Sequence, residues 1–256
     1  MASSGAGKVR VILVHGGCHG AWCWYKLKPL LEAAGHGVTA VDMAGAGVDS
    51  TDIRDLASFE HYSRPLTDLM AAIPPGEKAV LVGHSYGGES VSLAMDAFPD
   101  KIHVAIFVTA LISGSVLKLL AESKPEEFMD STITPVENRS NPEAQITSLL
   151  LGPNYLAHNL YHLSPPQDIA LAKMLVRPCP IFSGEKMARE KGFASVKRAY
   201  IVCGRDKTIP LTFQRWLIQT FGADRVIEMN DSDHMPMISD PLLLSRHLLQ
   251  IISAYC

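Results

Sequence analysis

The chain has 256 residues, of which 47% are hydrophobic and 19% are charged, and its formal net charge is −3. This balance is typical of a folded soluble protein and excludes a disordered chain, and without a basic cluster nucleic acid is not expected as a partner. No apolar run reaches the roughly 20 residues that span a bilayer, so no membrane partner is expected, and the length predicts a single domain over residues 1–256.

Apolar, β-branched runs alternate with helical patterns in the first half of the chain. Buried strands are predicted at residues 9–14, 38–42, 79–82 and 103–109, and helices at residues 22–34, 62–73 and 86–98. Strands that are apolar on both faces and separated by helices of this length are typical of a parallel sheet. The sequence therefore predicts a mostly parallel central sheet that is flanked by helices.

This alternation stops between residues 111 and 195. Helical patterns at residues 144–151 and 167–175 are punctuated by prolines, and no strand pattern of similar strength is present. Because a structureless loop of this length is implausible inside one domain, we interpret residues 111–195 as a mainly helical lid insertion. The sheet pattern then resumes with strands at residues 198–203 and 225–229, a helix at 212–221, and a final helix that opens at Pro241.

A G-x-S-x-G motif lies at the junction between the third predicted strand and the helix that follows it. It comprises residues 83–87, with Ser85 at its centre. A strand that turns sharply into a helix holds its central residue in a strained backbone conformation and exposes the side chain at the edge of the sheet. The N–H groups at the start of the helix suit a developing oxyanion. Ser85 is therefore our candidate nucleophile.

A serine nucleophile needs a histidine base and an acid from neighbouring loops, in the chain order serine, acid, histidine. His234 lies in a polar loop directly after the last predicted strand, whereas His247 lies inside the final helix. Asp206 follows the preceding strand, whereas Asp231 and Asp233 are close to the histidine and are typical turn residues. We expect Asp206 to orient His234, which in turn activates Ser85.

The glycine pair after the first predicted strand supplies the second part of the expected oxyanion hole. Residues 15–18 resemble the HGGG-type turn of lipases and esterases, so the N–H groups of Gly17 and Tyr86 are the predicted donors. Histidine pairs at i, i+4 spacing lack a third ligand, and the paired glycines elsewhere lack the context of a dinucleotide site. We expect no metal and no cofactor.

With these residues placed, the chain resembles the plant methylesterase and hydroxynitrile lyase family of α/β-hydrolases over nearly its whole length. The motifs that carry the resemblance are VHGGCHGAW at 14–22, WYKLKPLL at 24–31, AGH at 34–36, SVKRAYIV at 195–202 and DHM at 233–235. The resemblance implies the α/β-hydrolase fold and places the triad on Ser85, Asp206 and His234. Lyases of this family carry a threonine or asparagine in place of Gly16, and many carry a lysine in place of Met235, so the esterases are the better match.

The resemblance implies hydrolysis of methyl esters of small plant hormones or metabolites, of the salicylate, jasmonate or indole-3-acetate type. The expected partner is the small ester, with a homodimer left open, and five irregularly spaced cysteines favour reduced thiols in the cytoplasm. A hydroxynitrile lyase, an alkaloid-pathway esterase and a hormone-binding receptor remain alternatives. The expected substrate-binding residues are Gly16, His84, Phe128, Met129, Leu151, Tyr155, Phe182 and Met235.

Overall fold

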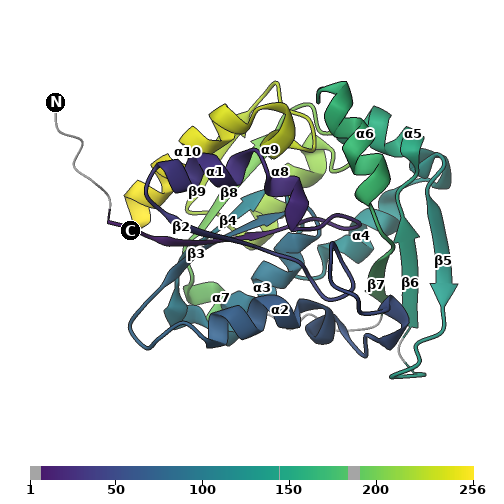
Figure 1. Ribbon diagram of the computed structural model, residues 1–256, viewed down its shortest axis with the longest axis horizontal. Helices are drawn as coiled ribbons and strands as arrows, with labels where there is room; N and C mark the ends of the chain where they lie inside the picture. The colour runs from purple at the N-terminus through teal and green to yellow at the C-terminus, as the bar shows by residue number, and fades with distance from the viewer. Residues whose placement is uncertain (1–6, 144, 184–190) are drawn as a thin grey trace.

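The computed structural model describes residues 7–143, 145–183 and 191–256, and a six-stranded parallel sheet forms its centre (Figure 1). The strands lie in the order β2-β1-β3-β4-β8-β9, and every neighbouring pair is parallel. Their bounds are β1 Arg10–Val14, β2 Gly37–Val41, β3 Ala79–His84, β4 Ile102–Val108, β8 Arg198–Cys203 and β9 Arg225–Met229. The predicted parallel sheet is confirmed, with strand ends that differ by two residues or fewer.

Helices cover both faces of this sheet (Figure 1). On one face α1 packs against α10, and on the other α3 packs against α2 and α7. The helices outside the segment 111–195 are α1 Leu27–Ala33, α2 Phe59–Ala71, α3 Gly87–Ala97, α8 Leu211–Phe221, α9 Pro236–Ser239 and α10 Pro241–Tyr255, with short 3-10 helices η1 Ala21–Trp24, η2 Ile53–Asp55 and η3 Pro99–Lys101. The central strands are therefore covered on both sides, as their uninterrupted apolar runs predicted.

The segment 111–195 contains a three-stranded antiparallel sheet that the sequence did not predict. Its strands are β5 Thr132–Val136, β6 Gln145–Leu150 and β7 Cys179–Ser183, and they lie in this order. The predicted helix at residues 144–151 is wrong: β6 occupies this stretch, because Ile146 pairs with Val136 on one side and with Phe182 on the other. Residues 144 and 184–190 of the predicted lid lie outside the described residues.

Helices also lie in the described part of that segment, as predicted. They are α4 Ser115–Glu122, α5 Pro153–Tyr155, α6 Pro166–Leu175 and α7 Lys191–Ser195, with a 3-10 helix η4 Pro125–Phe128 and a π-helical turn η5 Leu156–Leu160. Helix α6 confirms the helical pattern expected at residues 167–175. In Figure 1 the small sheet and α5 and α6 lie together at the end of the molecule opposite the N-terminus.

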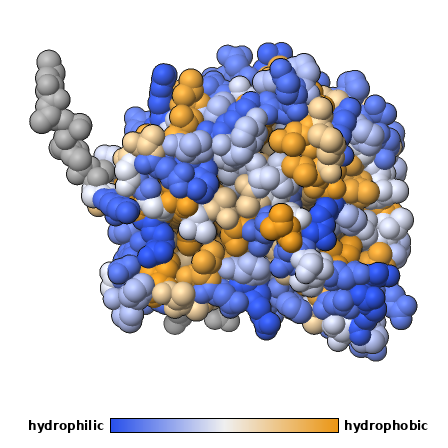
Figure 2. Space-filling view, viewed as in Figure 1, coloured by the Kyte–Doolittle hydropathy of each residue, from blue (hydrophilic) through white to orange (hydrophobic). Residues whose placement is uncertain are grey.

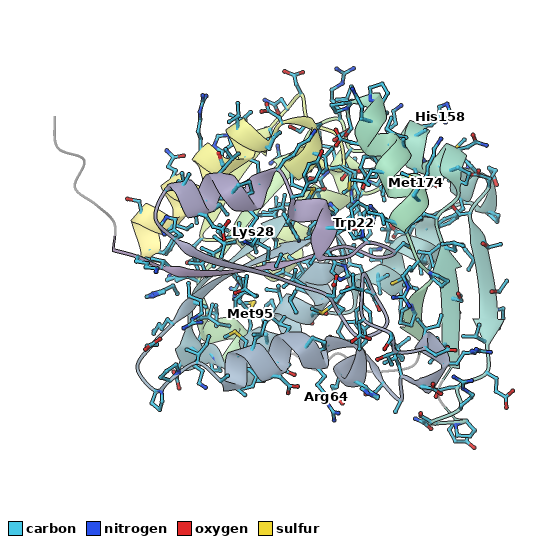
Figure 3. All side chains as sticks on the ribbon, viewed as in Figure 1. Trp22, Lys28, Arg64, Met95, His158 and Met174 are labelled. Atoms are coloured by element: carbon cyan, nitrogen blue, oxygen red, sulfur yellow. The ribbon has the colours of Figure 1, made fainter. Side chains whose placement is uncertain are left out.

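On the face that Figure 2 shows, polar and apolar side chains of the described residues are interspersed. Helix α6 carries an exposed Met174, which is 74% exposed and is labelled in Figure 3, followed by Leu175 at 37%. Within residues 7–143, 145–183 and 191–256, no helix combines the length and the apolar character needed to cross a membrane.

A buried carboxylate joins the sheet domain to the start of α4. Glu89, in the first turn of α3, is fully buried and accepts hydrogen bonds from the backbone N–H groups of Gly114 and Val116 and from the Ser115 hydroxyl. These N–H groups belong to the unsatisfied first turn of α4. Burial raises the pKa of Glu89 from 4.5 to about 7, and its hydrogen bonds oppose that rise.

The raised pKa of Glu89 predicts that part of the free energy of unfolding is lost as pH rises. Because the folded chain holds the Glu89 proton more tightly than the unfolded chain, this component is complete below about pH 4.5 and is lost as pH rises through about 7. The loss amounts to roughly 3 kcal/mol at full ionisation. Glu89→Gln removes this pH dependence. Urea unfolding at a series of pH values measures it, with exposed Glu60→Gln as control, and parallel curves for wild type and Glu89→Gln contradict it.

Candidate active site

The predicted nucleophile lies at the junction of β3 and α3 in a strained backbone conformation. Ser85 has a φ of 50°, in the left-handed region that residues with a Cβ rarely adopt. Glycines make the junction possible by close packing: a Cβ on Gly87 would lie 2.3 Å from the His15 carbonyl oxygen, and one on Gly88 would lie 2.1 Å from the Leu111 carbonyl oxygen. The Ser85 side chain lines the main cavity of the described chain.

The predicted acid and histidine meet by a direct hydrogen bond. Asp206 Oδ2 lies 2.7 Å from His234 Nδ1, and both side chains are almost completely buried. The carboxylate also accepts hydrogen bonds from the Thr109 hydroxyl at 2.5 Å and from the N–H groups of Thr208 and Ile209 at 2.7 and 2.9 Å. A proton on Nδ1, where it meets the carboxylate, leaves the lone pair of Nε2 available to accept a proton.

A second histidine fixes the backbone beside His234. The Nε2–H of His84 donates to the His234 carbonyl oxygen at 2.8 Å, and the two rings lie 4.7 Å apart. Burial holds the pKa of His84 well below its usual range, so this ring stays neutral. His84 also lines the cavity beside Ser85.

The glycine turn after β1 lies against the nucleophile. A Cβ on Gly16 would lie 2.8 Å from Ser85 Cβ and 2.9 Å from His84 Nδ1, so a larger residue there requires Ser85 or His84 to shift. A Cβ on Gly17 would lie 3.6 Å from Tyr86 Cβ, which places the two predicted oxyanion donors on facing elements. Both Gly17 and Tyr86 line the cavity.

The cavity has a volume of about 810 Å³ and is walled mainly by apolar side chains. Of the predicted substrate-binding residues, six line it: Gly16, His84, Phe128, Met129, Leu151 and Tyr155. Apolar residues of α4 and α8 also contribute, and the sequence analysis did not identify them: Val116, Leu119, Leu120, Phe213 and Trp216. The first three recur at i, i+3 and i+4, a helical periodicity that marks one face of α4.

Two predicted substrate-binding residues lie outside this cavity. Phe182 packs against Phe59, with ring centroids 6.2 Å apart, while its neighbour Ile181 lines the cavity, because successive side chains of a strand point to opposite faces. Met235 is fully buried in the core at the start of α9, and its N–H donates to Asp233 at 3.0 Å. The side chain of Met235, directly after His234, therefore lies in the core and not in the cavity.

Asp233 is more than the turn residue that the sequence predicted. It is fully buried and also accepts hydrogen bonds from the N–H of Leu163 and from the hydroxyls of Ser164 and Ser239, at 3.0, 3.3 and 2.8 Å. The loop that carries His234 is thus attached to the segment 111–195.

Together these groups can perform acyl transfer. A hydroxyl at a strained junction, a histidine whose Nδ1 is held by a carboxylate, and predicted N–H donors on two neighbouring elements are the components of serine-mediated nucleophilic catalysis. The buried apolar walls beside them suit the acyl part of an ester.

Comparisons with known proteins agree with this geometry. A model of the alpha/beta hydrolase family matches residues 11–246. The chain is 48% identical to methylesterase 3 of Arabidopsis thaliana over 97% of both chains, and 46% identical to salicylic acid-binding protein 2 of Nicotiana tabacum over 95% of this chain and 97% of that protein. The crystal structure of polyneuridine aldehyde esterase superposes with a TM-score of 0.88 at 42% identity, over 95% of this chain and 99% of that one. The predicted α/β-hydrolase fold is confirmed.

An added methyl group is expected to slow the reaction of Ser85 at Gly16 but not at the neighbouring Gly17. Gly16→Ala forces Ser85 or His84 to move, so phosphonylation of Ser85 by a fluorophosphonate is expected to slow by about a hundredfold. In Gly17→Ala the nearest atom is Cys179 Sγ at 3.4 Å, an ordinary contact, so the rate stays within about threefold of wild type. Intact-protein mass spectrometry measures both rates, and equal rates for the two folded variants contradict the prediction.

Proposed function

The chain belongs to the plant methylesterase family of α/β-hydrolases and is a carboxylesterase, and we propose that it hydrolyses methyl esters of small aromatic or alicyclic acids of the salicylate, jasmonate or indole-3-acetate type. The observation that carries this proposal is the 2.7 Å hydrogen bond between Asp206 and His234 at the edge of a cavity that Ser85 also lines. The name of methylesterase 3 supports a methyl ester as the substrate class, and the name of salicylic acid-binding protein 2 supports an aromatic acid as its acyl part.

The reaction proceeds in two halves. His234 accepts the Ser85 hydroxyl proton as Ser85 Oγ attacks the ester carbonyl, and the N–H groups of Gly17 and Tyr86 stabilise the oxyanion. The intermediate collapses to an acyl-enzyme, and methanol leaves with the proton that His234 donates. Water, deprotonated by His234, then releases the acid and regenerates Ser85, while Asp206 holds the imidazole orientation throughout.

The space beside the nucleophile supports ester hydrolysis over cyanohydrin cleavage. A side chain at position 16 would collide with Ser85 and His84, so this chain has no room there for the hydroxyl or amide that could hold a cyanohydrin oxygen. Met235 lies in the core and does not line the cavity, so its side chain offers no group to a departing cyanide.

The cavity volume supports a second candidate, an esterase of alkaloid metabolism. At about 810 Å³ the cavity lies toward the upper end of the range for small-molecule sites, so it accommodates an acyl group bulkier than salicylate. The similarity to polyneuridine aldehyde esterase supports the same candidate. In either case the residues 111–195 serve as the lid, since α4 and Tyr155 of this segment form walls of the cavity.

Hydrolysis of a panel of methyl esters tests the proposal. Methyl salicylate, methyl jasmonate, methyl indole-3-acetate and a polycyclic methyl ester are each incubated with wild type, Ser85→Ala and the control Ser195→Ala, which changes an exposed serine of α7. Turnover is expected in wild type and the control and falls by about a thousandfold or more in Ser85→Ala. Product acid is quantified for each ester, and free cyanide is quantified in a separate incubation of wild type with a cyanohydrin. Cyanide release from a cyanohydrin, or no ester turnover by folded wild type, overturns the proposal.

A further inference from the structure

The turn that carries Gly17 contains a strained residue. The His19 N–H donates to the Gly16 carbonyl oxygen at 3.3 Å, which closes a four-residue turn with Gly17 and Cys18 at its centre. Cys18 has a φ of 63°, in the left-handed region where glycine is the usual residue. A residue with a Cβ stays in this conformation only when its surroundings impose it.

Three further hydrogen bonds hold Gly17 and Cys18 within this turn, and they act on different groups. The Arg177 N–H donates to the Cys18 carbonyl oxygen at 3.0 Å, and the Cys18 thiol donates to the Leu149 carbonyl oxygen at 3.2 Å. Neither reaches the peptide between Gly17 and Cys18. The Gly17 carbonyl oxygen, which sets the orientation of that peptide, accepts from His19 Nδ1–H at 2.8 Å.

The His19 ring is itself fixed in one orientation and one tautomer. It is 1% exposed and stacks between Trp22, labelled near the centre of Figure 3, and Tyr161, with ring centroids 5.2 and 5.8 Å away. Burial lowers the pKa of His19 to about 4, so the ring is neutral at physiological pH. Because Gly17 O can only accept, Nδ1 carries the proton, and His19 Nε2 accepts from the Tyr161 hydroxyl at 2.7 Å.

We infer that His19 is a positioning residue: oriented by Tyr161, it holds the Gly17 carbonyl and thereby the left-handed turn at Cys18 that presents the Gly17 N–H to the reacting oxyanion. A flip of the Gly17–Cys18 peptide would relieve Cys18 and reverse a carbonyl dipole next to the proposed oxyanion donor. His19 Nδ1–H prevents this flip. The inference rests on the proposed function, since it assigns Gly17 as the donor. Tyr161 lies just after η5, so the segment 111–195 contacts the turn through the hydrogen bond from Tyr161 to His19.

Asparagine and leucine have nearly the same shape, so His19→Asn and His19→Leu separate the effect of the hydrogen bond from the effect of packing. In His19→Asn the amide nitrogen can occupy the place of Nδ1 and donate to Gly17, whereas His19→Leu cannot donate. Phosphonylation of Ser85 by a fluorophosphonate is expected to stay within about threefold of wild type in His19→Asn and to slow by about tenfold in His19→Leu. Ester hydrolysis by His19→Leu shows the same loss in kcat with little change in KM.

Replacing Cys18 by glycine should restore the phosphonylation rate of His19→Leu if His19 acts by holding the backbone of Cys18, and should not restore it if His19 acts only by packing. Because glycine adopts a positive φ without strain, His19→Leu/Cys18→Gly is expected to recover most of the lost rate. Tyr161→Phe, which removes a single hydroxyl and keeps the ring, is expected to slow phosphonylation by about fivefold, more than the change allowed for His19→Asn, and serves if His19→Leu fails to fold. A folded His19→Leu as fast as wild type, or a double variant that stays as slow as His19→Leu, overturns the inference.

A readout that does not use turnover keeps this inference separate from the proposed function. The ¹³Cα and ¹³Cβ chemical shifts of Cys18 respond to its backbone conformation and are compared in wild type, His19→Asn and His19→Leu. They are expected to move in His19→Leu alone, and unchanged shifts overturn the inference. If wild-type Ser85 is not phosphonylated, the proposed function fails, while the Cys18 shifts still decide whether His19 holds the turn.

Discussion

The left-handed backbone at Ser85 is the constraint on which the rest of the site depends. A φ of 50° at this serine turns the chain from β3 into α3 within one residue and brings α3 against the loops after β1 and β4. The Ser85 carbonyl oxygen accepts from the N–H groups of Gly88 and Leu111, so the strained conformation is held from its own helix and from the following loop. Glycines at 87 and 88 follow from that packing, because a Cβ at either position would overlap a carbonyl oxygen.

The parallel sheet and the triad were predictable because each depends on local order along the chain. Apolar runs such as β3 are buried on both faces, and the carboxyl ends of parallel strands necessarily meet at one edge. Ser85, Asp206 and His234 each follow such an end within five residues. Their proximity therefore follows from three short stretches of sequence, without knowledge of how distant segments pack.

The features that the sequence did not predict depend on contacts between segments far apart in the chain. Strand β6 exists because β5 and β7 flank it, and Phe182 faces Phe59 because of the register of β7. The hydroxyl of Thr109, the carboxylate of Asp233 and the ring of His19 find partners 70 to 142 residues away. One sequence carries no pattern for such pairs. The apolar face of α4 is the exception, since Val116, Leu119 and Leu120 recur in the sequence with helical periodicity.

The pairing of β4 directly with β8 has an evolutionary consequence. Strand β4 ends at Val108, and the parallel strand β8 begins at Arg198, which pairs with Ala105 of β4, so everything between them leaves the sheet at one edge and crosses back to re-enter it beside the strand that it left. Such an excursion can be lengthened, shortened or replaced with little disturbance to the strands that support it. Substrate preference can thus change when the segment between β4 and β8 is replaced. Each replacement must still supply the hydrogen-bond partners that the present segment gives to Asp233, Cys18 and His19.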